Sequence, residues 1–563
     1  MQTNQETGEK HALNAITAAD LLAHIEVLAS DEFAGRCPGT EGEAKTIAYF
    51  QNYFDGLSRS SGRHFETHVQ RVPATEIHSK PSLSLNLDGA GSPLTLQAPE
   101  QFVASSLTLE PSVAVKGSEA VFVGYGVVAP EYDWDDYKGV DVRGKTLVVL
   151  CGDPQIPHPE AATEAAGDAR LDESMFRGTE LTYYGRWTYK YEIAAKLGAA
   201  AIFIIHETER AGYGYDVVKA GFGATNFALN NKADAQKQVP VQGWFALDTA
   251  KDILQKSGLD FADLKKQALS KNFKPIPLKL KVDATIDSTF RNFESQNFVA
   301  TLPGNSSGST TAGSNSGSAT VGSNSGAATV VTNSGATSTS SLADEHVVYM
   351  AHWDHFGVTD AGILSGALDN ASGVASVLCI AKAFSLAPPL SRSVLFVIPT
   401  LEEHNLLGSK FYVANPRLPL PACLAGLNME ILGPWGVSKT FSSVCLGHTS
   451  LDDYLDQCAH AQGRVIVREP ESEKGYLYRS DHLEYMRVGV PCLAAFFPCA
   501  DHMAQRREYV KTTYHKPTDK VKADWDLAGA VLDTQLFFEV GLRILNDGTR
   551  ARWSAASEFR PRP

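Results

Sequence analysis

The sequence predicts an α/β fold, in which helices sandwich a mixed, mainly parallel sheet and a β-rich unit is inserted. From residue 345 to 550, nearly continuous apolar runs alternate with helical patterns, as expected for strands that are buried on both faces. From about residue 80 to 290, short β-rich runs dominate, with one helical pattern at 187–197. A chain of 563 residues is long enough for two or three domains.

The first part of the chain contains two helical patterns. Residues 17–29 place apolar side chains at helical spacing, with Thr17 as the expected N-cap. A polar segment, DEFAGRCPGTEGE (31–43), separates this pattern from a second one at 44–57. The predicted organisation is a main unit at 1–85, 286–302 and 343–550, an inserted unit at 86–285 with its core at about 115–270, a loop at 303–342 and a tail at 551–563.

A low-complexity segment interrupts the main unit. Residues 303–342 are rich in Gly, Ser, Thr, Asn and Ala and contain a rough nine-residue repeat. Such a sequence cannot bury enough apolar area to offset its ordering entropy, so we expect a flexible loop. The loop separates two strand-like runs, NFVATLPG and EHVVYMAHW, which we expect to form a hairpin.

The composition argues against several classes of protein. There are 50 Lys and Arg against 64 Asp and Glu, and no basic stripe, so a nucleic-acid or anionic-membrane binder is not indicated. The eight cysteines include no C-x-x-C pair, although Cys492 and Cys499 are close enough in sequence to bridge a loop. No apolar stretch reaches membrane-spanning length, and the first residues do not resemble a signal sequence.

Polar residues cluster directly after the apolar runs of the main unit. The carboxyl ends of strands in an open α/β sheet lie together at one edge, so these side chains should converge. Unpaired carboxylates at such a site would repel one another, and a pair of divalent cations would relieve that repulsion. The mixed nitrogen and oxygen donors suit zinc. The residues are His352, Asp354, Asp369, Asn370, Glu402, Glu403, Glu430, Ser480, Asp481, His482, Tyr514 and His515.

These segments resemble the M28 family of metallopeptidases, which are co-catalytic zinc aminopeptidases and their relatives. The resemblance covers 345–550 and the N-terminal LASDEFAGRCPGTEGE segment. The motifs that carry it are, in chain order, HWDH, GALDNASG, EEHNLLGS, LNMEILG, RSDH and YHKPTD.

The resemblance implies a ligand set for two Zn²⁺ ions. His352, Asp369 and Glu430 would hold one ion. Asp369, Glu403 and His515 would hold the other, with Asp369 bridging the two. The family commonly has Asp where this chain has Glu430, and Glu offers the same carboxylate on a longer stem.

The resemblance also implies the catalytic roles. Glu402 would be the general base, Asp354 would orient a histidine ligand, and Tyr514 would donate a hydrogen bond to the oxyanion. Adjacent residues on an extended segment point in opposite directions, so Glu403 should face metal while Glu402 faces the attacking water. Relatives that are aminopeptidases hold a free substrate amine beside the metals, which makes the reaction exopeptidic.

Other polar residues have weaker assignments. Asp481 and His482 match a recurrent family motif without being metal ligands, and a role in the substrate pocket competes with a structural one. His355 and His404 are read as packing or supporting residues. Ser480 is not surrounded by the G-x-S-x-G pattern of a serine nucleophile.

Residues 115–270 resemble a protease-associated (PA) domain, on the segments 120–154 and 190–206. Such domains lie beside the active site in relatives, so this unit is expected to act as a lid that selects short peptides. A spacer or an oligomer contact is the alternative.

The function expected from the sequence is a zinc aminopeptidase that acts on peptides. A metallocarboxypeptidase or dipeptidase, a glutaminyl-cyclase-like acyltransferase and a non-catalytic receptor-like protein are the alternatives. We expect no nucleic-acid partner and no transmembrane segment. We expect an exported protein, periplasmic or secreted, whose leader is absent from this chain, with the cytoplasm as the alternative.

Overall fold

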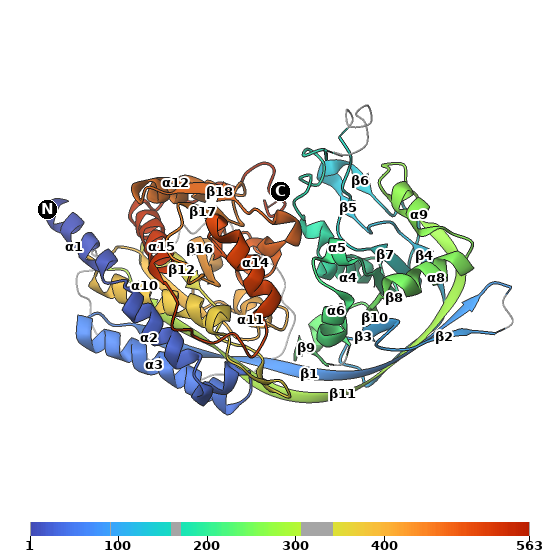
Figure 1. Ribbon diagram of the computed structural model, residues 1–563, viewed down its shortest axis with the longest axis horizontal. Coiled ribbons are helices and arrows are strands. Elements are labelled where there is room, and N and C mark those ends of the chain that lie inside the picture. Colours follow the sequence, from blue (N-terminus) through green and yellow to red (C-terminus); the bar gives the residue numbers. More distant parts are fainter. Residues whose placement is uncertain (1, 90–91, 159–169, 224, 306–341, 562–563) are drawn as a thin grey trace, which may run out of the picture.

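The computed structural model describes residues 2–89, 92–158, 170–223, 225–305 and 342–561. The predicted loop at 303–342 therefore lies almost wholly outside the described residues. Two large hydrophobic clusters divide the structure. We call the part built on residues 12–65 and 298–545 the core unit, and the part built on residues 83–286 the inserted unit. The two units lie side by side (Figure 1).

The core unit contains the predicted sheet with helices on both faces. Its strands are β12 (His346–Met350), β15 (Ser393–Ile398), β16 (Cys423–Glu430) and β19 (Cys492–Phe496), in the order β19-β16-β12-β15, and all are parallel. Leu427 of β16 faces Gly541 of α15 (Ala528–Asp547), whereas Asn428 donates to Ser480, beside α13 (His482–Arg487). Adjacent strand residues thus contact helices on opposite faces, which confirms the predicted fold class.

The hairpin expected across the low-complexity segment is wrong. The first run is the end of β11 (Ile276–Leu302), which pairs antiparallel with β15. The second run is β12, which lies on the other side of β15. The chain leaves β12, forms α10 (Gly373–Leu386) and returns as β15 between the two runs. Strands that are apolar on both faces do not record which strand is their neighbour, so the sequence could not reveal this order.

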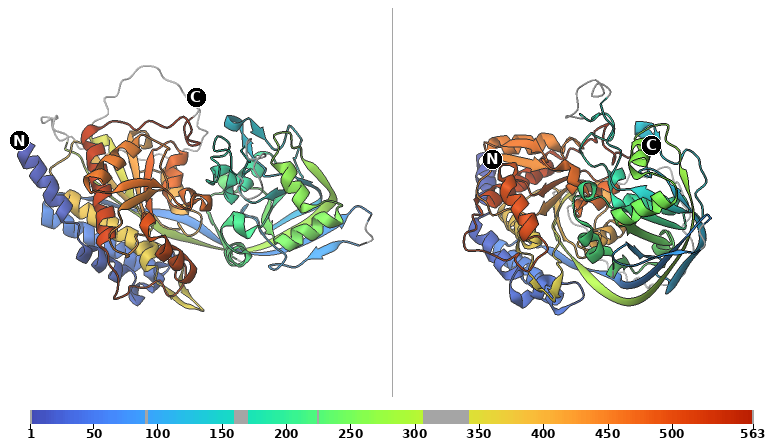
Figure 2. Two further views of the ribbon diagram at one scale, coloured as in Figure 1. Left: turned by 45° about the horizontal axis from the view of Figure 1, so that its top comes forward. Right: turned by 45° about the vertical axis from the view of Figure 1, so that its right-hand side comes forward.

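A long two-stranded ribbon joins the two units. Strand β1 (Glu66–Leu87) has 22 residues and β11 has 27, and they pair antiparallel along the whole of β1. Figures 1 and 2 show the ribbon running beneath both units. Near its middle, Val72 and Ala74 pack against Leu401, the residue before Glu402. The predicted domain limits at 85/86 and 285/286 fall inside this ribbon, and they stay a prediction.

The inserted unit extends the same sheet. Strands β4 (Ser112–Phe122), β7 (Thr146–Leu150), β8 (Ala201–Ile205) and β10 (Val241–Phe245) are parallel to one another. The predicted helix is present as α4 (Trp187–Lys196). The remaining elements of this unit are β2 (Leu94–Leu96), β3 (Phe102–Ser105), β5 (Val128–Ala129), β6 (Trp134–Asp135), α5 (Thr208–Ala211), α6 (Tyr215–Phe222), β9 (Thr225–Leu229), α7 (Lys232–Ala235), α8 (Leu247–Lys256) and α9 (Phe261–Ala268).

The N-terminal helices confirm the sequence pattern. Helix α2 (Ala18–Leu28) begins after Thr17, whose Oγ1 accepts the Asp20 N–H at 3.2 Å, and α3 (Glu41–Ser61) follows. The other elements of the core unit are α1 (Gln2–Asn14), β13 (Gly357–Thr359), β14 (Gly362–Leu364), α11 (Leu407–Ala414), β17 (Thr440–Ser443), α12 (Leu451–Ala461), β18 (Val465–Arg468) and α14 (Met503–Thr512).

Two expectations about single segments change. Cys492 and Cys499 do not form a disulfide, since all eight cysteines are free thiols. No apolar stretch was predicted to reach membrane-spanning length. Among the described residues, however, one helical stretch, Ala367–Leu386, is long and apolar enough to span a membrane. In its 18-residue apolar window, 94% of the residues are buried inside the structure, as in the central helix of a folded domain.

Candidate metal centre

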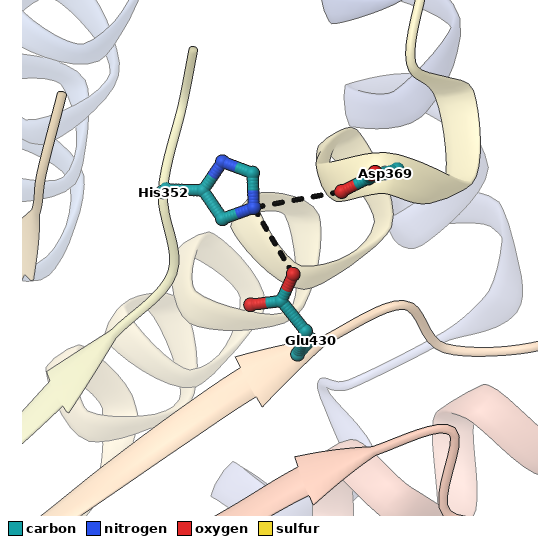
Figure 3. Close-up of side chains that lie close together, drawn as sticks. All are labelled: His352, Asp369 and Glu430. Atoms are coloured by element: carbon teal, nitrogen blue, oxygen red, sulfur yellow. Dashed lines mark hydrogen bonds and ion pairs between the residues drawn. The ribbon is translucent and has the colours of Figure 1, made fainter. Parts of the chain in front are cut away.

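The predicted residues converge at the carboxyl edge of the core-unit sheet. His352 follows the end of β12, and Glu430 is the last residue of β16. Asp369 lies in η6 (Ala367–Ser372), which leads directly into α10. Figure 3 shows these three side chains, which come from two strand ends and a helix start, pointing toward one another. His515 reaches the same place from the turn after α14.

The first candidate ion site is formed by three buried side chains. His352 Nε2 lies 3.0 Å from Glu430 Oε1 and 3.5 Å from Asp369 Oδ1. All three residues are at most 2% exposed. One imidazole and two carboxylates whose ligand atoms lie within 4.8 Å of one another form the kind of donor set that binds zinc.

The second candidate ion site shares Asp369. Its other oxygen, Oδ2, lies 3.0 Å from His515 Nε2, which is 3.2 Å from Glu403 Oε2. Asp369 Oδ2 and His515 Nε2 are both buried and have no hydrogen-bond partner among the described residues. Buried polar atoms rarely lack partners, so two such atoms facing each other fit a shared cation. The ligand set that the family resemblance implies is thus brought together.

A second histidine reaches the same carboxylate. His355 Nδ1 lies 2.6 Å from Glu403 Oε1, the oxygen that does not face His515. His355, Asp369 and Glu403 also form a group with ligand atoms within 4.8 Å of one another. The supporting role expected for His355 is consistent with this contact, because a hydrogen bond to one oxygen leaves the other free for an ion.

The two successive glutamates diverge, but by a different geometry from the one expected. The segment is not extended, because Leu401 has a φ of 55°. Asp354 instead fixes both residues, since its Oδ1 and Oδ2 accept the N–H groups of Glu402 and Glu403 at 3.1 and 3.4 Å. Glu402 Oε2 then lies 3.7 Å from His352 Nε2, while Glu403 turns toward the second ion site.

Asp354 contacts the first histidine as well. His352 Nδ1 is 3.1 Å from the backbone oxygen of Asp354 and 3.7 Å from its carboxylate. The main-chain contact favours the tautomer that leaves Nε2 free for a metal. The Asp354 carboxylate was predicted to orient His352, but its hydrogen bonds are to the backbone N–H groups of Glu402 and Glu403.

The charges of these groups divide them into two kinds. Burial alone would raise the pKa of Asp369, but contacts with the flanking imidazoles outweigh it and hold the pKa well below its usual range. Burial also opposes ionisation of Glu403, yet His515 brings its pKa down to about 2. Burial, with Glu430 and Glu403, raises the pKa of Glu402 well above its usual value. Of these three carboxyl groups, Glu402 therefore holds a proton most strongly.

The remaining candidates lie around this centre. The Tyr514 ring stacks on His515, with 3.7 Å between centroids, and burial raises the Tyr514 pKa, so its hydroxyl remains a donor. Asp481 is fully buried, and neither carboxylate oxygen has a hydrogen bond within the described residues. His482 is also buried, and its Nδ1 lies 3.4 Å from Asn428 Nδ2. His404 stacks on Phe227 of β9, which agrees with a packing role.

Two supporting residues were not assigned these roles from the sequence. Arg36 is 1% exposed and donates to the backbone oxygens of Leu28, Trp353, Ser365 and Gly366. It therefore connects the segments that carry His352 and Asp369 to α2. The only sequence signal was its place in the 28–43 motif. Ser480 donates to Glu430 Oε2 at 2.5 Å, and its place in the RSDH motif did not reveal that partner.

The part of the chain that forms this site matches a known protein family. Residues 330–538 match the model of peptidase family M28. No curated protein matches the chain. The chain is similar to the aminopeptidase from Aneurinibacillus sp. strain AM-1, at 17% identity over 99% of this chain and 98% of that one, with a TM-score of 0.49. It is also similar to BSAP, a zinc aminopeptidase from Bacillus subtilis, at 16% identity over 97% of this chain and 99% of that one, with a TM-score of 0.44.

The likeness extends to one protein of a different activity. The Porphyromonas gingivalis glutaminyl cyclase is 17% identical, over 46% of this chain and 79% of that one, with a TM-score of 0.28. The M28 match spans every candidate ligand, from His352 to His515. The chain is accordingly a zinc-dependent metallopeptidase.

Proposed function

We propose that this metallopeptidase is an aminopeptidase that holds two zinc ions and releases N-terminal residues from short peptides. The observation that carries the proposal is the position of Asp369, whose two oxygens lie 3.5 and 3.0 Å from His352 and His515. A carboxylate between two imidazoles is the arrangement that bridges a pair of cations. Glu430 and Glu403 complete one group on each side.

Bound zinc would supply Lewis acidity toward the scissile carbonyl and would lower the pKa of the attacking water. Glu402 takes a proton from that water and delivers it to the leaving amine. Glu402 Oε2 lies 3.7 Å from His352 Nε2, which places it beside the first ion site for this transfer. Tyr514 is protonated and stacked on His515, from where its hydroxyl donates a hydrogen bond to the developing oxyanion.

Asp481 supports an aminopeptidase over a carboxypeptidase. Its buried carboxyl group has no hydrogen-bond partner among the described residues, and it follows Ser480, which contacts the ligand Glu430. A carboxyl group in this position can pair with the ammonium group of a free peptide N-terminus. This gives Asp481 the pocket role that competed with a structural one, whereas the Asn428 contact of His482 supports a structural role.

We propose that the inserted unit is a PA-like lid. The two units touch through Leu181 N–H, which donates to Ser472 O at 3.2 Å, and through the Tyr183 and Tyr478 rings, 5.9 Å apart. These contacts lie beside Ser480, and a unit in that position restricts the length of chain that can enter. Measuring kcat/KM for peptides of increasing length tests this, and an intact unfolded protein cleaved as fast as a tripeptide would contradict it.

The tripeptide Leu-Ala-Phe tests the main proposal. The free and N-acetylated forms are incubated with zinc-loaded protein, with and without a chelator, and the products are identified by mass spectrometry. An aminopeptidase releases Leu from the free form only, and the chelator abolishes the reaction. Release of Phe from the acetylated form would identify a carboxypeptidase, and absence of all products would contradict a peptidase acting on short peptides.

A further inference from the structure

The contact between the two units brings two segments face to face near the metal centre. The segment 181–192 of the inserted unit lies against the segment 472–487 of the core unit. Besides the Leu181 contact described above, Arg487 Nη2 lies 3.0 Å from Glu192 Oε1. In Figure 1, α4 and α5 lie on the side of the inserted unit that faces the core unit. Each segment carries one arginine whose charge has no partner among the residues that the structure describes.

Arg186 and Arg479 are these two residues. Within the described part of the chain, neither guanidinium forms a hydrogen bond or an ion pair, and the Nε atom of each is buried. Each lies over an aromatic ring instead, Arg186 Cζ at 5.5 Å from Trp187 and Arg479 Cζ at 5.2 Å from Tyr476. Both side chains are partly exposed, so their guanidinium groups can receive an anion that the described residues do not supply.

The same contact region shows how arginine is normally satisfied in this protein. Arg506 lies 2.8 Å from Glu469, and Arg487 contacts both Glu484 and Glu192. Carboxylates are therefore abundant in this region of the structure, yet Arg186 and Arg479 are not paired with them. A role as counter-charges for the protein's own acidic groups would require such pairs.

The two arginines lie at the contact between the units, and Arg479 is next in the chain to a residue of the metal centre. Arg479 precedes Ser480, which holds Glu430, and its Nη2 lies within 3.9 Å of the position of a Cβ on Gly212 of the inserted unit. Burial and the neighbouring charge of Arg479 lower the pKa of Arg186 to about 10, while Glu402 acts in the opposite direction. Arg186 is therefore within electrostatic range of both Arg479 and the candidate base.

We propose that Arg186 and Arg479 form a binding site for a substrate carboxylate, in first place the C-terminal carboxylate of a di- or tripeptide. The inference rests on the proposed aminopeptidase function and names its substrate class. Guanidinium groups bind carboxylates through two parallel hydrogen bonds. An extended peptide advances only about 3.3 Å per residue, so only a very short peptide places both termini in this centre. An acidic side chain at the second residue offers the same chemistry.

Matched peptides separate these two sources of carboxylate. Leu-Gly is compared with Leu-Gly-NH₂, and Leu-Glu-NH₂ with Leu-Gln-NH₂, in the zinc-loaded full chain. We expect kcat/KM for Leu-Gly to exceed that for its amide by about tenfold or more, mostly through KM. A preference for Leu-Glu-NH₂ over Leu-Gln-NH₂ alone would assign the site to an acidic side chain.

Variants connect the preference to the arginines. Arg186→Gln and Arg479→Gln should each reduce the Leu-Gly to Leu-Gly-NH₂ ratio toward one, with the amide rate and the zinc content unchanged. Arg143→Gln, an exposed residue paired with Asp141, is the matched control and should leave the ratio intact. Arg186→Lys and Arg479→Lys, which keep the charge, should retain part of the preference.

The outcomes distinguish this inference from the proposed function. Cleavage of all four peptides at equal rates would overturn the carboxylate site while leaving the aminopeptidase intact. A preference that persists in both Gln variants would also overturn it. Loss of zinc in those variants would mean that the arginines support the metal centre instead. No cleavage of any peptide by the wild-type protein would contradict the proposed function itself.

Discussion

Replacing Ser480 by alanine should weaken one ion site without disturbing the fold around it. The Ser480 hydroxyl donates to Glu430 Oε2 at 2.5 Å and accepts from Asn428 Nδ2 at 2.8 Å. It therefore holds the carboxylate with its other oxygen, Oε1, toward His352. Removing the Ser480 oxygen leaves Glu430 Oε2 with the longer hydrogen bond from Asn370 Nδ2, at 3.4 Å, and so loosens the carboxylate.

The size of the effect follows from this single hydrogen bond. A hydrogen bond to a charged group contributes about 1.5–3 kcal/mol, and each 1.4 kcal/mol corresponds to about tenfold in affinity. We therefore expect the Ser480→Ala variant to bind one zinc about 10- to 100-fold more weakly, which is the usual range for loss of a residue that orients a metal ligand. The second zinc should bind as in the wild type, because its ligands do not touch Ser480.

Titration of the metal-free protein with zinc against a chromophoric chelator measures both affinities. Activity at saturating zinc should remain within a few-fold of wild type. Ser376→Ala is the matched control, because the Ser376 hydroxyl is equally buried but, among the described residues, is hydrogen-bonded only to Thr534. If Ser480→Ala binds both ions as tightly as the wild type, Ser480 does not orient Glu430 and the reasoning fails.

Three further changes test other parts of the site. Glu402→Gln should retain zinc but lower kcat by roughly 10²–10⁴, the contribution of a general base, and an unchanged kcat would refute its role. Arg36→Lys keeps a charge but cannot reach all four carbonyls, so the free energy of unfolding measured with urea should fall by about 2–4 kcal/mol. Lys45→Arg, a change at the surface, is the control. Burial raises the pKa of Glu558, which accepts from Tyr478, to about 7. The pKa of Glu558 in the folded protein is higher than the unfolded value of about 4.3. The contribution of Glu558 to docking of the tail is therefore complete below about pH 4.3 and is lost as the pH rises through 7. Hydrogen exchange of the tail at pH 5 and 8 should show this change in the wild type and not in Glu558→Gln.

Much of the candidate site could be predicted from the sequence because its residues directly follow buried strands. His352 and Glu430 end apolar runs, and the carboxyl ends of parallel strands meet at one edge whatever the strand order. The hydrogen-bond partners within the site were harder to predict. Ser480 lies 50 residues from Glu430 in the chain, and no local pattern indicates that its hydroxyl reaches that carboxylate.

The connection between the units was the least predictable part. The expected hairpin failed because a strand buried on both faces can have any buried strand as its neighbour. Strands β1 and β11 mix polar and apolar residues over lengths that exceed an ordinary strand, so their continuity across two units had no clear signal. The segment 551–561 was read as a tail, yet Glu558 contacts both Tyr478 and Tyr183 and so touches each unit.

The ribbon of β1 and β11 joins the two units through a continuous series of paired residues. Its 22 paired positions span about 70 Å at 3.3 Å per residue. Deleting two facing pairs would shorten the ribbon by about 7 Å and keep every side chain on its face, whereas deleting one pair would turn over the side chains that follow it. The length of the ribbon can therefore change only in steps of two residues if its buried and exposed faces are to be kept.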